Sequence, residues 1–154
     1  MHEDEIHLFA KAIEAIRGGF FLDAIVDLET LYHGHPDSDL SDDALYNIAK
    51  CYFEVNQFAK ALEAIDTLLT QYPQATISAL ENAFEFGRTA AKAQYLKVLC
   101  LLSQRQVDMA RNAAAALSEH SDSYILDDGR KLSFADLAAK ALETYESMGF
   151  DQND

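Results

Sequence analysis

Residues 42–73, DDALYNIAKCYFEVNQFAKALEAIDTLLTQYP, decide the fold of this chain. Apolar residues recur every three or four positions on both sides of Asn56 and Gln57, which predicts two amphipathic helices joined by a tight turn. Pro73 ends the second helix, because proline has no amide hydrogen and pushes the preceding residue toward extended backbone. Ala49 and Ala61 are small enough to let the two helix backbones approach closely.

The same pattern occurs 37 residues earlier, which indicates an internal repeat. The positions that match are small or apolar and end on a proline. Paired with their later counterparts, they are Leu8 with Leu45, Ala12 with Ala49, Phe21 with Phe58, Ala24 with Ala61, Leu28 with Ile65, Leu31 with Leu68, and Pro36 with Pro73.

This spacing of bulky, small, aromatic and proline positions resembles the tetratricopeptide repeat family. In residues 42–73 the matching positions are Leu45, Ile48, Ala49, Tyr52, Phe58, Ala61, Ile65, Leu68 and Pro73. Leu68 departs from the usual alanine, the earlier copy departs at Lys11 and Ala15, and the 37-residue period is longer than the family's usual one. The resemblance implies an all-α fold, an α-α superhelix of tetratricopeptide-like helical hairpins with a C-terminal capping helix.

A third, degenerate repeat follows. Its matching positions are Val107, Ala110, Ala114 and Leu117, and no proline closes it. The additional residues before it also show helical spacing, at Ile77, Leu80, Ala83 and Phe84. We therefore expect one long helix over residues 76–103, bent near Gly87.

The C-terminal part predicts a turn at residues 127–129 and a helix that begins after a Ser133 cap and ends at Gly149. Repeat arrays need such a helix to cover their last apolar face. The expected organisation is one helical-repeat domain, residues 1–154. It contains repeat 1 (about 5–38), repeat 2 (about 42–75), an extended degenerate repeat 3 (about 76–122) and the capping helix (about 133–148).

The net charge of −14, from 12 basic and 26 acidic residues, argues against nucleic acid or an anionic membrane surface as a partner. The sequence has no apolar run long enough to predict membrane insertion, and its acidic start does not resemble a secretory signal. We therefore expect a cytoplasmic protein, with periplasmic association as the less favoured alternative. Isolated Cys51 and Cys100 are typical of reduced core cysteines, although the sequence leaves a disulfide between them open.

The residue pattern gives no reason to expect an enzyme, a metal site or a cofactor. His33 and His35 lie two residues apart, whereas helical metal sites prefer spacings of three or four. The acidic pairs are typical of helix caps and turns, and no glycine-rich phosphate loop is present.

The resemblance implies a non-catalytic module that binds a protein or peptide in a concave groove lined by the first helix of each hairpin. The residues that it places there are Phe9, Ile13, Ile16, Tyr46, Lys50, Phe53, Lys92 and Tyr95. An apolar groove of this kind suits an amphipathic helix. Some of these residues could instead belong to the core, because a shift of one position in the assigned repeat register exchanges groove positions with core positions. Self-association into a homo-oligomer is the alternative function, and an enzyme of unknown reaction is a remote one.

Overall fold

The computed structural model describes residues 3–149 as helical hairpins with one small sheet. In chain order the elements are α1 (Glu3–Arg17), α2 (Phe21–Gly34), α3 (Ser41–Glu54), α4 (Phe58–Gln71), β1 (Glu85–Phe86), α5 (Thr89–Ser103), α6 (Val107–Ala115), a 3₁₀ turn (Ala116–Glu119), β2 (Tyr124–Asp127), β3 (Arg130–Ser133) and α7 (Phe134–Ser147).

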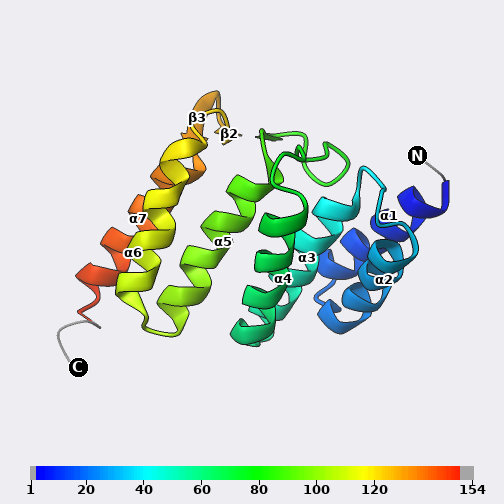
Figure 1. Ribbon diagram of the computed structural model, residues 1–154, viewed down its shortest axis with the longest axis horizontal. Coiled ribbons are helices and arrows are strands. Elements are labelled where there is room, and N and C mark those ends of the chain that lie inside the picture. The colour runs from blue at the N-terminus through cyan, green and yellow to red at the C-terminus, as the bar shows by residue number, and fades with distance from the viewer. Residues whose placement is uncertain (1–2, 150–154) are drawn as a thin grey trace.

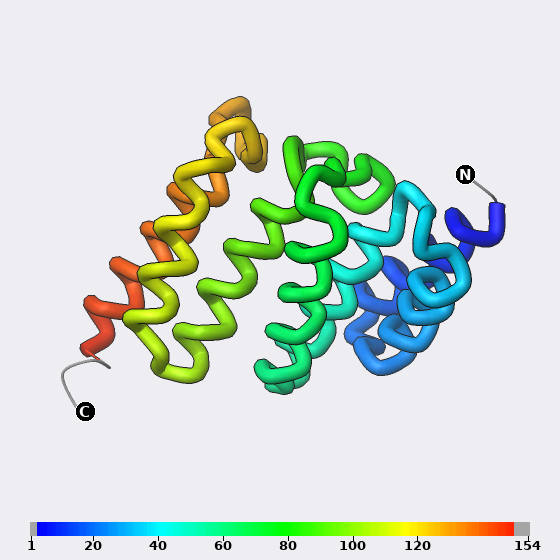
Figure 2. The backbone as a smooth tube through the Cα atoms, in the orientation of Figure 1, coloured from blue at the N-terminus to red at the C-terminus, as the bar shows by residue number. Residues whose placement is uncertain are grey.

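The helices form two layers, visible in Figures 1 and 2. Helices α2, α4 and α6 make the outer layer, and α1, α3, α5 and α7 make the other, whose surface we call the inner face (Figure 1). Each hairpin packs against the next, and α7 covers both α5 and α6. The predicted all-α superhelix of tetratricopeptide-like hairpins is thereby confirmed. None of the helices within residues 3–149 is both long and apolar enough to cross a membrane.

The three hairpin turns share one geometry. A residue with positive φ follows each first helix: Gly19 at 82°, Asn56 at 63° and Arg105 at 59°. The next amide then donates back to a carbonyl five residues earlier, at 2.8 Å in the first two turns and 2.9 Å in the third. This is the bond of a Schellman motif, which satisfies free carbonyls at the helix end. The degenerate third repeat therefore turns as the first two do.

The buried core consists of two adjoining clusters. The first cluster runs through helices α1, α2, α3, α4 and α5 and is centred on large side chains such as Phe9, Leu28 and Ile65. The second joins α5, α6 and α7 around Leu101, Leu117 and Phe134. Alanines at the repeat positions 12, 24, 49, 61 and 110 have no exposed surface.

The expected long helix over residues 76–103 is wrong in its first half, because the helix begins only at Thr89. Side chains in the preceding segment bond to nearby backbone and favour turns: Ser78 accepts from the Leu80 amide, and Asn82 from the Phe84 amide. Gly87, at φ 105°, passes so close to Ser123 that a Cβ there would lie 2.5 Å from the Ser123 Cα. Leu80 and Phe84 have helical spacing, but both side chains are more than half exposed, so little apolar burial favours a helix there.

The small antiparallel sheet, in the order β1-β2-β3, was not expected from the sequence. It pairs Phe86 with Tyr124 and so ties the segment before α5 to the segment before α7. The predicted turn joins β2 to β3, and the expected Ser133 cap is present, since its hydroxyl accepts from the Asp136 amide at 3.0 Å. Cys51 and Cys100 are both buried and free.

Replacing Ala61 by leucine tests the close helix contact. We expect Ala61→Leu to lower the free energy of unfolding by about 1–3 kcal/mol, because a larger side chain at a fully buried site forces the backbones apart. The control is Ala59→Leu on the exposed side of α4, which should stay within about 0.5 kcal/mol of the parent. Urea unfolding followed by circular dichroism measures both, and equal midpoints would contradict the assigned register.

Candidate functional site

Two hollows open on the inner face, and they divide the residues that the sequence placed in one groove. The first, which we call the first groove, has a volume of about 520 Å³ and lies over α1, α3 and the start of α5. It is lined by Ile13, Ile16, Arg17, Phe21, Tyr46, Asn47, Lys50, Glu54, Glu81, Asn82, Glu85 and Lys92. Five of the eight expected residues therefore lie together in it.

The second groove has a volume of about 530 Å³ and lies between the C-terminal halves of α3, α5 and α7. Its lining is mostly apolar and consists of Phe53, Leu99, Leu102, Ser103, Arg105, Ala141, Thr144, Tyr145 and Met148. Of the eight expected residues, Phe53 lies here, and its ring packs edge-on against Phe58 at 5.6 Å between centroids.

Four expected residues belong to the packing between helices. Ile13 and Tyr46, which also line the first groove, are only 7% and 8% exposed and lie in the first core cluster. Phe9 is only 1% exposed and lies in the first core cluster, so its expected place on the binding surface is corrected. Tyr95 is half-buried in the second cluster, with its ring 6.3 Å from that of Phe134. Phe9 and Tyr95 both follow the helical pattern of the groove positions, but the neighbouring helices cover them.

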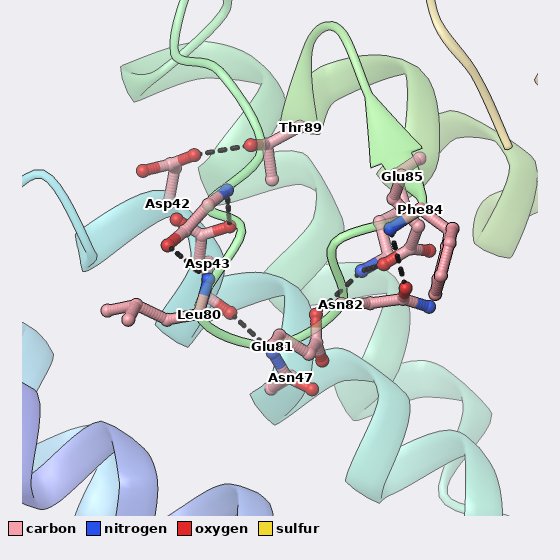
Figure 3. A network of polar contacts seen from close by, with 11 residues as sticks. Asp42, Asp43, Asn47, Leu80, Glu81, Asn82, Phe84, Glu85 and Thr89 are labelled. Carbon is pink, nitrogen blue, oxygen red and sulfur yellow. Dashed lines mark hydrogen bonds and ion pairs between the residues drawn. The ribbon is translucent and has the colours of Figure 1, made fainter. Parts of the chain in front are cut away.

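A segment that we call the strap, residues 77–87, forms one wall of the first groove. Its carboxylates meet Lys92 of α5, with Glu81 at 2.7 Å and Glu85 at 2.8 Å from the ammonium nitrogen. The same nitrogen lies 4.1 Å from the centre of the Tyr46 ring on α3. Figure 3 shows Glu81, Asn82 and Glu85 projecting from the strap beside the start of α3.

The Lys92 ammonium stays charged although its side chain is only 6% exposed. Burial by itself lowers the pKa of Lys92, but Tyr46, Glu81 and Glu85 outweigh that effect and raise the pKa above its ordinary value. A buried cation needs such partners, because an unpaired charge away from water is strongly unfavourable. The strap thus supplies the charges that the buried lysine requires.

Two buried carboxyl groups at the start of α3 bind the first residue of α5 and the strap. The Thr89 hydroxyl donates to Asp42, and the Ser78 amide donates to Asp43 at 3.0 Å (Figure 3). The Asn47 side chain, one turn further along α3, donates to the Asp43 carbonyl at 2.9 Å.

Burial and the adjacent Asp42 together raise the pKa of Asp43 to about 8, against the hydrogen bond from the Ser78 amide and the charge of Lys92. Burial likewise raises the pKa of Asp42, against the hydrogen bond from Thr89. Near neutral pH the Asp43 carboxyl is therefore largely protonated, and the contact with Ser78 connects an uncharged acid to the strap.

The chemistry of the inner face suits binding. Burial raises the pKa of the Cys51 and Cys100 thiols to about 12, so neither is a thiolate nucleophile at neutral pH. Within residues 3–149 no group of three or more histidine, cysteine or acidic side chains has an arrangement that could hold a metal ion. What the face offers is two grooves, one apolar and one lined by both charged and apolar groups.

The strap carboxylates Glu81 and Glu85 were not predicted from the sequence. The signal that could have found them is the length of the connection. Residues 72–88 join α4 to α5, seventeen in all, whereas residues 35–40, only six, join α2 to α3 in the preceding repeat step.

Residues 1–79 match the protein family described as YfiO, outer membrane lipoprotein. No curated protein matches the chain. Among solved structures, a tetratricopeptide repeat protein from Parabacteroides merdae ATCC 43184 is similar, with a TM-score of 0.62 and 19% identity over 91% of this chain. The match covers 44% of that protein, so this chain spans less than half of its length.

The first tetratricopeptide repeat domain of Spaghetti (RPAP3), bound to the HSP90 peptide SRMEEVD, is similar as well. Its TM-score is 0.65 at 13% identity, and the match covers 95% of this chain and 93% of that one. At these identities the two structures show a shared fold.

Removing the titrating group at Asp43 should change how stability depends on pH. Because folding raises the pKa of Asp43 from 3.8 to about 8, this group makes the protein progressively less stable as pH rises between those values. We expect Asp43→Asn, which keeps an acceptor for Ser78, to be more favourable relative to the parent at pH 8 than at pH 4, by at least about 1 kcal/mol.

Urea unfolding of both proteins at pH 4, 6 and 8 measures this difference. Asp37→Asn, which removes one exposed carboxylate from the neighbouring loop, is the matched control. A stability difference between Asp43→Asn and the parent that stays constant across the three pH values would contradict the assignment.

Proposed function

We propose, because this chain belongs to the family of the outer membrane lipoprotein YfiO and has a tetratricopeptide repeat fold, that it is a non-catalytic module whose inner face binds a segment of a partner protein. The observation that carries this proposal is the second groove. It is a surface hollow lined mainly by apolar side chains from three helices that lie far apart in the sequence.

The second groove has the properties of an anchor site. Phe53 comes from α3, Leu99 and Leu102 from α5, and Met148 follows α7, where its side chain is 60% exposed. A few apolar side chains at the centre of an interface usually supply most of its binding energy. Methionine adds adaptability, because its unbranched side chain adjusts to irregular partner surfaces. The helices that carry these side chains pack against one another, so the groove exists before a partner arrives.

The partner class that fits this groove best is a short segment with spaced apolar side chains, such as an amphipathic helix or an apolar peptide. Such segments place anchors one helical turn apart in a hydrophobic groove. The peptide bound to the similar Spaghetti domain supports a peptide-like partner for this chain as well.

The cellular location that we propose is inferred from the family. Its description as an outer membrane lipoprotein favours association with that membrane, the periplasmic alternative that the sequence analysis ranked below the cytoplasm. Separating cell membranes from soluble fractions and detecting the untagged protein tests this part of the proposal. Recovery in the cytoplasmic fraction alone would overturn it.

Self-association is a second candidate, because α2 begins with an exposed apolar patch. Phe20, Leu22 and Val26 are each more than 60% exposed, and Leu22 and Val26 lie one helical turn apart. A second copy could cover this patch on the outer layer. Light scattering of the parent and of Leu22→Lys with Val26→Lys separates this possibility from partner binding at the inner face.

Placing charge in the second groove should remove partner binding without unfolding the protein. We expect Leu99→Lys with Met148→Lys to weaken retention of the partner at least about tenfold, since an unpaired ammonium must lose water in an apolar contact. The control is Met109→Lys on α6, which places a lysine at a methionine of the outer layer that is 54% exposed.

The parent and the variants are immobilised, and the proteins that each retains from a detergent extract of the source cells are compared. The affinity of the parent and of each variant for the retained protein is then measured. Circular dichroism checks that helicity is unchanged. Equal losses in Met109→Lys and in the groove variant would show that the second groove is not the binding site.

A further inference from the structure

The strap is an insertion between two regularly packed hairpins. A six-residue connection suffices between α2 and α3, so most of residues 72–88 are not needed to bring α5 onto α4. The two ends of the strap meet: Thr76 and Arg88 form an antiparallel bridge, and the Ile77 amide donates to Gly87 at 2.9 Å. The strap is thus a closed loop that leaves the helical array and returns to the same place.

Polar contacts hold the strap on the inner face. They are the two ion pairs to Lys92 and the hydrogen bond from Ser78 to Asp43. Apolar contacts and strand pairing lie at the two ends of the strap, where Ile77 packs against the second core cluster and Phe86 of β1 stacks on Tyr124 of β2. In the middle of the strap, Leu80 is 54% exposed and Phe84 is 62% exposed. Since apolar burial is the main force that holds loops to a core, the middle of the strap opens more readily than the helices beneath.

Lifting the strap would change the charge of the first groove. With the strap in place, the lining contains three basic groups, Arg17, Lys50 and Lys92, and three acidic ones, Glu54, Glu81 and Glu85. Without it, three basic groups face Glu54 alone, and Glu54 is already paired with Lys50. The Lys92 ammonium and the face of the Tyr46 ring would then lie open at the centre of the groove.

We propose that the strap is a built-in occupant of the first groove, and that a partner segment displaces it by placing two carboxylates on Lys92 where Glu81 and Glu85 now lie. This inference rests on the proposed function, in which the inner face binds a protein segment. An incoming segment that covers Lys92 again buries its ammonium, which then needs carboxylates in place of Glu81 and Glu85, so the segment must be acidic at these two points. The net charge of −14 repels an acidic partner at long range, so the recognition depends on these short contacts.

The strap sequence itself provides the probe. A capped synthetic peptide of residues 77–87, ISALENAFEFG, carries both carboxylates at their native spacing. In the parent the tethered strap competes at an effective concentration on the order of millimolar, so the peptide should bind weakly. In the full-length Glu81→Gln, Glu85→Gln variant the tethered competitor loses its charges, and the peptide should bind at least about tenfold more tightly.

Two controls fix the contact. A peptide with glutamine at both acidic positions should not bind the variant, and adding Lys92→Met to the variant should remove binding of the acidic peptide. Leu99→Lys with Met148→Lys leaves the first groove intact and should not change peptide binding. A failure of the proposed function at the second groove therefore stays distinguishable from a failure here. Peptide affinities that are equal in the parent and in the Glu81→Gln, Glu85→Gln variant would overturn the proposal.

Hydrogen exchange of the unmodified protein tests the strap without any substitution. If the strap is displaceable, the Ser78 and Phe84 amides, which donate to side chains, should exchange at least about 100-fold faster than the central amides of α5. If the strap is instead a fixed brace of the fold, these amides will exchange only at the rate of the helices, and the proposal fails.

Discussion

The close approach of helices at the buried alanines is the constraint on which the rest of this structure depends. Alanines at positions 12 and 24 in the first hairpin, and at 49 and 61 in the second, have no exposed surface. A backbone with no bulky side chain at the contact lets its neighbour pack directly against it, so each hairpin has the same geometry. The repeated geometry brings α3 against α5 and α5 against α7, and the inner face follows from that. The positive φ at one residue of each hairpin turn serves the same purpose, because it reverses the chain within three residues.

The strap interrupts this regular array, and it gives the inner face two unlike halves. Near the start of α3 and α5 the strap covers the face, and buried charges balance one another around Lys92. Near the ends of α3, α5 and α7 there is no covering segment within residues 3–149, and the second groove is apolar and open. The family to which the chain belongs and its repeat fold favour a binding function, and the two halves would give one partner an apolar anchor and a charged, regulated contact.

The sequence predicted the repeat register, the turns and the Ser133 cap because each depends on local signals: small residues at fixed spacing, turn residues and a capping hydroxyl. It did not predict the strap. Ile77, Leu80 and Phe84 have helical spacing, but periodicity cannot show that Leu80 and Phe84 stay exposed, nor that Ser78 and Asn82 bond to the backbone. The site was predicted in part for a similar reason. Ile16, Tyr46 and Lys92 line a groove while Phe9 is covered, and that difference depends on neighbours that only the three-dimensional structure shows.

We propose that the inner face, rather than the outer layer, meets the partner. Hydrogen exchange of the protein alone and in complex with its captured partner tests this most directly, because it reports every backbone segment at once. We expect slower exchange at the C-terminal ends of α3, α5 and α7, faster exchange of the strap as it is displaced, and unchanged exchange in α2, α4 and α6. Protection confined to the outer layer, with the strap and the second groove unchanged, would contradict it.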